Sequence, residues 1–335
     1  MDYNVLILTD HSGHTPENSV YALASAFVAH PNISAVDIAS RGSPDNRVFF
    51  NGNPEAVLSV IPAVPRFSYE KALELFDTAS SETELSDYDF VLLRLPQPVP
   101  ETLFHSLRES FPEDHIINSP SGIIYTGSKA FLLEVADLCA PVRLVKTADD
   151  MLEFLHLHPI VLKPLYGHGG KGIVKVTTLN AENETGKQMS HEELFRQWKP
   201  PYLGMKFLKH TTQGDKRTVV VNGVIIGSSL RKPAPDRWMC NVAQGGTAEH
   251  AVADEDEQRI ARRLAKEVGK YGIVIFGFDT LMDDDGRRVL SELNTMSTGG
   301  LKQIRDAEGK PVIKQIVSQL VQHLDDVWFG NLQSG

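Results

Sequence analysis

The feature that most constrains the fold is a glycine-rich loop between two strand-like runs. Gly167 to Gly172 contains four glycines in six residues and follows the apolar run Ile160–Pro164. After the loop, Ile173–Val176 alternates in the way that predicts a strand. The order strand, glycine loop, strand predicts a hairpin flap, in which the glycines let the backbone approach an anion closely.

Several nucleotide-binding motifs can be excluded at this loop. Its glycines match G-x-G-x-x-G, but a dinucleotide-binding fold requires a helix after the loop, and a strand is predicted here. The chain has no G-x-x-x-x-G-K-[ST], H-R-D or D-F-G, so P-loop and protein-kinase sites are excluded. Lys163 is a charge in an otherwise apolar strand, which indicates an anionic partner. These observations favour a phosphate-covering flap, and the alternative is a flexible hairpin without a ligand.

Residues 1–122 alternate short apolar runs with helical patterns. The predicted strands are 5–8, 35–39, 89–96 and 115–120, and the predicted helices are 20–29 and 101–110. This alternation indicates a mostly parallel sheet covered on both faces, whose ligand-facing residues follow the carboxyl ends of strands. Asp10 and Arg94 occupy such places. A solvated loop acid is the favoured interpretation of Asp10, whereas Arg94 interrupts an apolar run where an unpaired charge is costly.

Two further stretches complete the chain. A helix over 128–138, a strand at 141–147 and a helix at 148–158 are predicted before the glycine hairpin. Beyond residue 203, a second hairpin turns at Asn222-Gly223. Lys216, Arg217 and Arg231 gather at its far end, as either a phosphate clamp or a solvated basic edge. The helical pattern over 255–272 is amphipathic, which is typical of structural packing.

A third hairpin predicts a metal site. Asp285-Gly286 is a preferred centre of a two-residue turn, and with these residues as the loop Asp279 lies opposite Glu292. Asn294 projects from the same face as Glu292. Facing carboxylates repel each other unless a proton or cation lies between them, and two carboxylates with an amide oxygen suit Mg²⁺. The alternative is a solvent-facing pair, and a register slip of one residue would move Asp279 to the other face.

Charge and composition limit the remaining function classes. The 335 residues carry 33 Lys and Arg against 43 Asp and Glu, a net charge of −10, so nucleic-acid and acidic-membrane partners are not expected. No apolar run approaches the roughly 20 residues of a membrane span, and the first residues lack a signal peptide's basic region. Two cysteines are too few for a disulfide framework. We expect a cytoplasmic protein of two or three domains that acts on small molecules.

Four segments carry a resemblance to a known family. VLKPLYGHGGKGIVKV, QGDKRTVVVNG, AQGG and FGFDTLMDDDGRRVLSELN occur in the order and spacing of the ATP-grasp ligases, and the chain resembles bacterial glutathione synthetases in particular. The resemblance is densest from Lys129 to Gly300. It implies an α/β (α+β) class, with an ATP-grasp fold and an N-terminal parallel-sheet pre-ATP-grasp domain. The implied parts are the N-terminal domain at 1–122, a lid subdomain with the glycine flap at 123–203 and a C-terminal subdomain with the metal site at 204–330.

The same resemblance implies a nucleotide site along three segments. Lys129 and Lys163 would contact the phosphates of ATP. The residues of the flap that would close over these phosphates are Gly167, His168, Gly169, Gly170, Lys171 and Gly172. The linker whose backbone would receive adenine contains Lys206, Phe207 and Leu208.

The resemblance also implies roles around the reacting groups. The catalytic residues would be Arg217 and Arg231, near the transferred phosphoryl group, together with Lys163. The substrate-binding residues would be Arg94, Arg231, Asn241, Gly245 and Gly246. The ligands of Mg²⁺ or Mn²⁺ would be Asp279, Glu292 and Asn294.

The implied activity is that of an ATP-dependent carboxylate–amine ligase of glutathione biosynthesis. It would join γ-glutamylcysteine to glycine through an acyl phosphate, in a homo-oligomer. Two departures lie toward the acceptor substrates: Met239 stands where the family commonly has an arginine, and Thr298 where it has a proline. A ligase for another amino acid or peptide is therefore one alternative. A nucleotide-binding module without turnover is another, and the intact Lys163, Arg217 and Asp279 argue against it.

Overall fold

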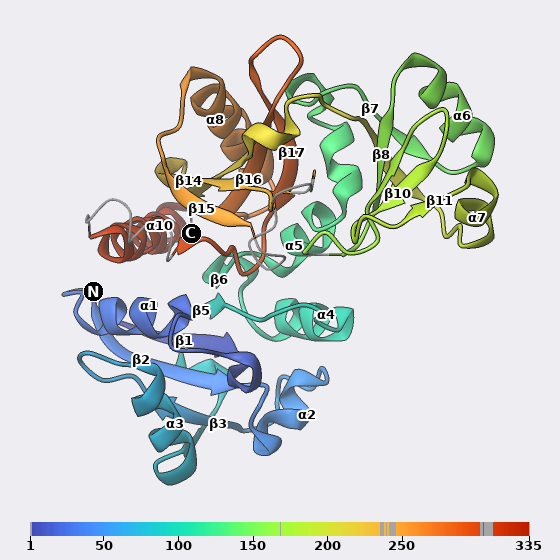
Figure 1. Ribbon diagram of the computed structural model, residues 1–335. Coiled ribbons are helices and arrows are strands. Elements are labelled where there is room, and N and C mark those ends of the chain that lie inside the picture. Colours follow the sequence, from blue (N-terminus) through green and yellow to red (C-terminus); the bar gives the residue numbers. More distant parts are fainter. Residues whose placement is uncertain are drawn as a thin grey trace.

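The structure is a computed structural model that describes residues 2–167, 169–234, 238, 240, 246–301, 304 and 311–334. Three β-sheets follow one another along the chain (Figure 1). None of the helices in these ranges combines the length and apolar character needed to cross a bilayer.

The N-terminal sheet is parallel at its centre and antiparallel at one edge. Its strands are β1 (Tyr3–Thr9), β2 (Ile33–Ser40), β3 (Leu58–Pro62), β4 (Ser81–Thr83), β5 (Phe90–Leu93) and β6 (Ile116–Ile117). In the order β4-β3-β2-β1-β5-β6, the strands from β2 to β6 run parallel, as predicted. The antiparallel edge formed by β3 and β4 was not predicted.

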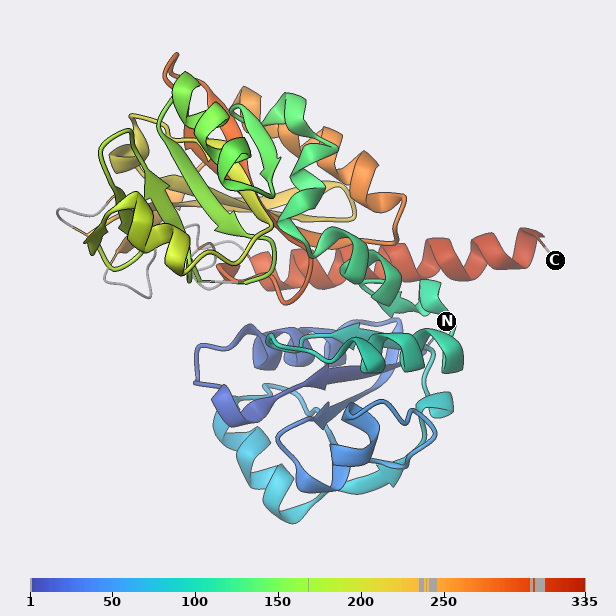
Figure 2. The same ribbon diagram turned by 90° about the vertical axis from the view of Figure 1, so that its right-hand side faces the viewer.

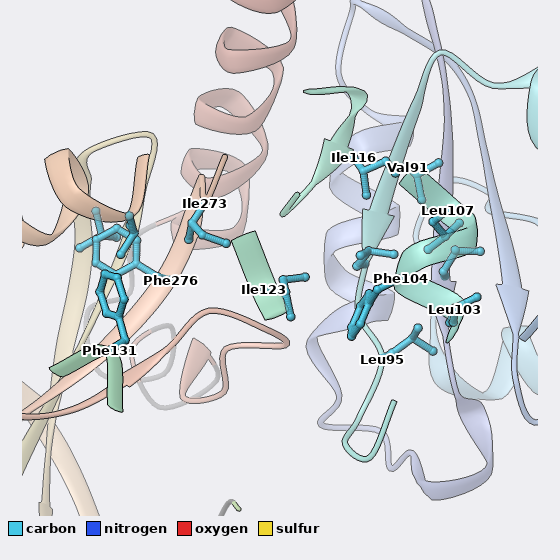
Figure 3. Packing of buried hydrophobic residues seen from close by; sticks show 14 of the residues in the cluster. Val91, Leu95, Leu103, Phe104, Leu107, Ile116, Ile123, Phe131, Ile273 and Phe276 are labelled. Carbon is cyan, nitrogen blue, oxygen red and sulfur yellow. The ribbon is translucent and has the colours of Figure 1, made fainter. Parts of the chain in front are cut away.

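Helices cover both faces of this sheet, as the alternating pattern predicted. They are α1 (Ser19–Val28), α2 (Arg47–Phe50), α3 (Tyr69–Thr78), α4 (Glu101–Ser110) and α5 (Pro120–Thr126). Figure 3 shows Phe104 and Leu107 of α4 beside Val91 of β5, and Ile123 of α5 between them and Phe276 of the C-terminal sheet. One buried apolar cluster therefore extends from the N-terminal sheet to the C-terminal sheet.

The middle sheet carries the glycine loop. Its strands are β7 (Val142–Val145), β8 (Ile160–Pro164), β9 (Val174–Val176), β10 (Ala181–Asn183), β11 (Gln188–Met189) and β12 (Tyr202–Lys206), and its helices are α6 (Ala148–Leu157) and α7 (His191–Arg196). β8 and β9 pair antiparallel across the loop, which confirms the predicted hairpin.

The predicted helix over 128–138 is wrong. Two short 3₁₀ turns, Lys129–Leu133 and Ala136–Leu138, stand in its place. Val135 between them has φ −123° and ψ 33°, outside the helical region. The backbone N–H of Lys129 donates to the Leu165 carbonyl oxygen, which attaches the first turn to the end of β8.

The C-terminal sheet has the order β15-β14-β13-β16-β17. Its strands are β13 (Asp215–Val221), β14 (Val224–Lys232), β15 (Thr247–Ala251), β16 (Ile275–Met282) and β17 (Arg288–Asn294). Helix α8 (Glu255–Gly269) packs on it through Ile260, Leu264 and Val268, as its amphipathic pattern predicted. Helix α10 (Val312–Ser334) lies between this sheet and α1 (Figure 2). The domain boundaries stay a prediction, and β12 crosses the one between 203 and 204.

Of the turns predicted for the two C-terminal hairpins, one is confirmed and one is wrong. Asn222 and Gly223 both have positive φ and connect β13 directly to β14, as predicted. The predicted two-residue loop at Asp285-Gly286 is wrong, because the Asp283 N–H donates to the Arg287 carbonyl oxygen and closes a three-residue loop. The Asp283 carboxylate also accepts the N–H groups of Asp285 and Arg287, which stabilises the longer loop.

A β-bulge restores the predicted register farther from this turn. Thr280 pairs with Leu290, whereas the preceding residue Asp279 pairs with Glu292, so Ser291 is the extra residue. The predicted pairing of Asp279 with Glu292 is therefore confirmed, although the turn that was used to predict it differs.

Candidate active site

A cavity of about 780 Å³ is lined by residues from all three sheets and their loops. Most of the predicted site residues line it together: Arg94, Lys163, Gly169, Gly170, Lys206, Phe207, Leu208, Arg217, Arg231, Asp279, Glu292 and Asn294. Lys129, Gly167, Lys171, Gly172 and Gly246 are not among the lining residues. His168, Asn241 and Gly245 lie outside the described residues. The volume falls within the range typical of small-molecule sites.

The predicted metal ligands share the cavity side of the β16–β17 hairpin. Asp279 pairs with Glu292, and Asn294 is two residues farther along β17. The amide nitrogen of Asn294 is buried and has no hydrogen-bond partner among the described residues. Those residues include no cluster of three or more His, Cys, Asp or Glu side chains able to hold a metal. Two carboxylates and an amide still suit a cation such as Mg²⁺, which completes its shell with phosphate oxygens and water.

Two arginines neutralise Asp279. Arg217 donates to both of its carboxylate oxygens at 2.7 Å, and Arg231 Nη2 lies 2.8 Å from Oδ2. Burial alone would raise the pKa of Asp279, but the two guanidinium groups outweigh it and hold the pKa well below its usual range. Arg231 also donates to Asp215 at 2.6 and 2.8 Å. Asp215 belongs to the G-D-K-R segment, but sequence reasoning assigned it no role.

The phosphate clamp predicted on the second hairpin contains Arg217 and Arg231 but not Lys216, so the prediction is wrong for Lys216. Side chains alternate along β13, so Lys216 points to the face opposite Arg217. Its Nζ atom lies 2.6 Å from Glu257 Oε2 beneath α8. Arg217 and Arg231 line the cavity and are held by carboxylates, which contradicts the alternative of a solvated basic edge.

The two predicted phosphate lysines both lie near Glu292. Lys163 Nζ donates to the Ser291 carbonyl oxygen at 2.8 Å, at the bulge of β17. Desolvation lowers the pKa of Lys163, and the Glu292 carboxylate opposes the shift. Lys129 Nζ donates to the Gly167 carbonyl oxygen at 2.6 Å and lies 3.8 Å from Glu292 Oε1. Lys129 therefore connects the base of the flap to the predicted metal carboxylate.

The predicted adenine linker forms another part of the cavity wall. Lys206 Nζ lies 2.8 Å from Asp284 Oδ2, and the Lys209 N–H donates to the same carboxylate, so the loop of the β16–β17 hairpin holds the linker. Lys175 Nζ lies 4.1 Å from the centre of the Phe207 ring, and the Trp238 ring lies 5.8 Å from it. Sequence reasoning missed Asp284, Lys175 and Trp238 because they come from distant segments.

Comparison with known proteins decides the family. Residues 128–309, more than half of the chain, match the model of the prokaryotic glutathione synthetase ATP-grasp domain. The chain belongs to this family. This ATP-grasp enzyme is 28% identical to a glutathione synthetase of Prochlorococcus marinus over 71% of the chain and 76% of that protein. It is 29% identical to one of Mesorhizobium japonicum, over 69% and 72%. The chain is an ATP-dependent ligase, of a family that uses ATP and a divalent metal.

Solved structures show the same fold at low sequence identity. D-cycloserine synthetase DcsG superposes with a TM-score of 0.64 at 12% identity, over 96% of this chain and 99% of that one. The ATP-grasp ligase PsnB, in a complex with a precursor variant, Mg and ADP, gives a TM-score of 0.56 at 13% identity, over 96% and 99%. The expected ATP-grasp fold is confirmed.

One departure from the family pattern lies inside the cavity of this ATP-grasp ligase. Thr298 is buried, and its hydroxyl donates to the Asn294 carbonyl oxygen at 3.2 Å. Its own carbonyl oxygen accepts a hydrogen bond from Arg94 Nη2 at 3.4 Å. The loop after β17 therefore connects a predicted metal ligand to Arg94. The other departure, Met239, lies outside the described residues.

The structure also places Asp10 and the two cysteines. Asp10 lines the cavity and its Oδ2 lies 2.8 Å from Arg41 Nε, so the interpretation as a solvated loop acid is wrong. Cys139 and Cys240 are partly buried, and burial raises the pKa of each thiol to about 12. Such thiols stay protonated near neutral pH and are weak nucleophiles.

Proposed function

We propose that this ATP-grasp ligase is a glutathione synthetase that joins γ-glutamylcysteine to glycine with conversion of ATP to ADP and phosphate. One observation carries the proposal: Asp279, Glu292 and Asn294 line one cavity together with Lys163, Arg217 and Arg231. The curated relatives named glutathione synthetase support the choice of substrates. Mg²⁺ is the proposed metal, with Mn²⁺ as a substitute.

The proposed reaction has two steps that need no protein nucleophile. A carboxylate oxygen of γ-glutamylcysteine attacks the γ-phosphorus of ATP, and the bond between this phosphorus and the bridging oxygen of ADP breaks. The amine of glycine then attacks the acyl carbon, loses a proton and displaces phosphate. Lys163, Arg217 and Arg231 offset the negative charge on the moving phosphoryl group. A divalent cation held by Asp279, Glu292 and Asn294 would neutralise phosphate oxygens.

The remaining predicted residues position the substrates. We assign the phosphates to Lys129, Lys163 and the flap, whose Gly169 and Gly170 line the cavity and whose closure would exclude water from the acyl phosphate. Adenine is assigned to the linker at Lys206, Phe207 and Leu208. The proposed peptide-binding residues are Arg94, Arg231, Asn241, Gly245 and Gly246.

A second candidate is a ligase of the same chemistry that takes another amino acid or peptide. It is favoured by Thr298, which replaces the family proline and is buried beside Arg94. A homo-oligomer and a cytoplasmic location stay predictions of the resemblance, and light scattering would test the first of them.

The test is a phosphate-release screen of amino acids and dipeptides with ATP and Mg²⁺, with products identified by mass spectrometry. Release with γ-glutamylcysteine plus glycine, and formation of glutathione, supports the proposal. Release with only another pair supports the second candidate. No release with any pair contradicts both and indicates a nucleotide-binding module without turnover.

A further inference from the structure

The loop of the β16–β17 hairpin contacts the predicted adenine linker at three points. Asp284 Oδ2 lies 2.8 Å from Lys206 Nζ, and Asp284 Oδ1 accepts the Lys209 backbone N–H at 3.1 Å. The Asp283 carbonyl oxygen accepts a hydrogen bond from His210 Nδ1 at 2.8 Å. The linker is therefore attached to the C-terminal sheet from Lys206 to His210.

The loop is built so that Asp284 can make these contacts. The Asp283 carboxylate accepts the N–H groups of Asp285 and Arg287, which fixes the backbone on both sides of Asp284. The hydrogen bond from Lys206 is the largest cause of a lowered pKa for Asp284, and the Lys209 N–H adds to it. Asp284 is therefore a charged carboxylate at neutral pH, held on a fixed loop.

The middle sheet holds the same linker through its backbone. The Lys206 N–H donates to the Pro141 carbonyl oxygen and the Phe207 N–H to the Pro159 carbonyl oxygen, both at 2.8 Å. These prolines precede β7 and β8. Two parts of the molecule therefore fix the linker, and the hairpin loop does so through a side chain, Asp284, that can be replaced.

The hairpin that holds the linker also carries two predicted metal ligands, Asp279 and Glu292. Asp284 follows Asp279 by five residues, roughly 16 Å of extended chain. This length is comparable to that of an extended nucleoside triphosphate. Lys206, Asp279 and Glu292 line the cavity, whereas Asp284 is not among the described residues that line it. One hairpin thus connects the predicted metal ligands with the linker, and Asp284 acts on the cavity through the linker.

We propose that Asp284 is a positioning residue for nucleotide binding, which holds the linker at the distance from the metal ligands that a metal-bound nucleotide requires. This inference rests on the proposed function, which assigns adenine to the linker. A linker that is already held in place costs less to order when the nucleotide binds. Asp284 should therefore affect the affinity for ATP and ADP, with little effect on the chemical step.

A binding experiment tests this role without turnover. The probe is ADP with Mg²⁺, measured by calorimetric titration. Asp284→Ala removes both acceptor oxygens, and we expect the Kd of ADP to rise about tenfold. The matched control is Asp285→Ala, which removes the exposed neighbouring carboxylate of the same loop and should leave the Kd unchanged. An unchanged Kd in a folded Asp284→Ala variant, or an equal rise in both variants, overturns the proposal.

Milder substitutions keep the test decisive if Asp284→Ala fails to fold. Asp284→Asn keeps an acceptor for the Lys209 N–H but loses the charge that faces Lys206, and we expect the Kd of ADP to rise about threefold. In a Lys206→Met background the same substitution should cause no further rise, because the partner of the charge is gone. Effects of the two substitutions that multiply in full contradict the proposal.

A kinetic experiment separates this inference from the proposed function. In Asp284→Ala the KM of ATP should rise about tenfold, whereas kcat and the KM of γ-glutamylcysteine should stay within about twofold of the wild type. A general loss of structure would lower kcat as well. If the variant is active and its KM of ATP is unchanged, the inference is wrong although the ligase activity stands. If ADP binding depends on Asp284 but γ-glutamylcysteine and glycine are not joined, the proposed function fails and the inference stands.

Discussion

The C-terminal sheet carries a charged cluster on each face. One cluster is buried beneath a helix, whereas the other lines the cavity. The cavity-face cluster contains Asp215, Arg217, Arg231, Asp279 and Glu292. The α8-face cluster contains Lys216, Glu257 and Thr280. Consecutive residues of β13 and β16 contribute to opposite faces, because side chains alternate along a strand.

In the α8-face cluster, the charged and polar groups pair with one another in the protein interior. Glu257 has 0% exposure, and its Oε2 lies 2.6 Å from Lys216 Nζ. Its Oε1 accepts a hydrogen bond from the Thr280 hydroxyl at 2.6 Å. The cavity-face cluster instead lines a cavity large enough for a ligand. The comparison teaches that buried, paired charges alone do not indicate a functional site, whereas paired charges that also line a cavity do.

The largest expected effect is on the cavity face, at Glu292. Its one ion pair among the described residues is a long one, 3.8 Å to Lys129, so Glu292→Gln should fold normally. Loss of a predicted metal carboxylate should lower kcat at least about 1,000-fold, because charge on the phosphates is no longer neutralised. Phosphate release measures kcat, and thermal unfolding tests whether the variant folds normally. Electron paramagnetic resonance of Mn²⁺ in the presence of ADP measures metal binding.

The matched control for this substitution is Glu255→Gln, on the exposed surface of α8. It should leave kcat, metal binding and unfolding temperature unchanged. Wild-type activity in Glu292→Gln would remove the metal assignment and with it the functional distinction between the two faces.

The next largest effect is on stability, at the α8 face. Glu257→Gln leaves Lys216 buried without its strongest partner, which should lower the free energy of unfolding by about 3 kcal/mol. Urea unfolding measures this loss, and kcat should stay within about threefold of the wild type while the variant is folded. A large loss of kcat without any loss of stability would contradict a purely structural α8-face cluster.

The pH dependence of turnover should reflect the protonation of Lys163, which lines the cavity. Its pKa is lowered by desolvation, so the ammonium loses its proton below the usual lysine range as pH rises. We expect the activity of the wild type to fall several-fold on the alkaline side, at a lower pH than that at which an ordinary lysine loses its proton. Lys163→Arg, which stays charged, should be less active at neutral pH but should lack this decline. The same alkaline decline in both proteins would contradict the assignment to Lys163.

Local patterns were sufficient to predict the elements that depend on neighbouring residues. The helix predicted at 101–110 coincides with α4, and Asn222-Gly223 forms the predicted turn. The glycine hairpin and the amphipathic helix α8 were also predicted, because hydrophobic periodicity and turn-forming residues can both be recognised within short segments of sequence. At β16–β17 the loop was predicted one residue too short, yet Asp279 and Glu292 still pair, because the bulge at Ser291 compensates.

Tertiary contacts account for what could not be predicted. Lys216 and Arg217 are adjacent cations that the sequence does not distinguish. Only the placement of α8 shows that Lys216 is structural. Arg94 meets Thr298 across 204 residues of sequence, and no local signal indicates that contact. The turns at 129–138 have helical spacing of apolar residues, but bonding to the end of β8 overrides that spacing.

The smallest expected effect, on the free energy of unfolding, comes from removing both charges of the α8-face cluster, and it gives the clearest test of the difference between the two faces. Replacing the buried pair in the double variant Lys216→Met with Glu257→Leu removes both charges together, which is often neutral for stability. We expect its free energy of unfolding within about 1 kcal/mol of the wild type, and kcat near the wild-type value. The matched double variant on the cavity face, Arg217→Met with Asp279→Leu, should fold but lose turnover. If the α8-face double variant also loses turnover, its charges act on the reaction through the sheet, and the two faces form one functional unit.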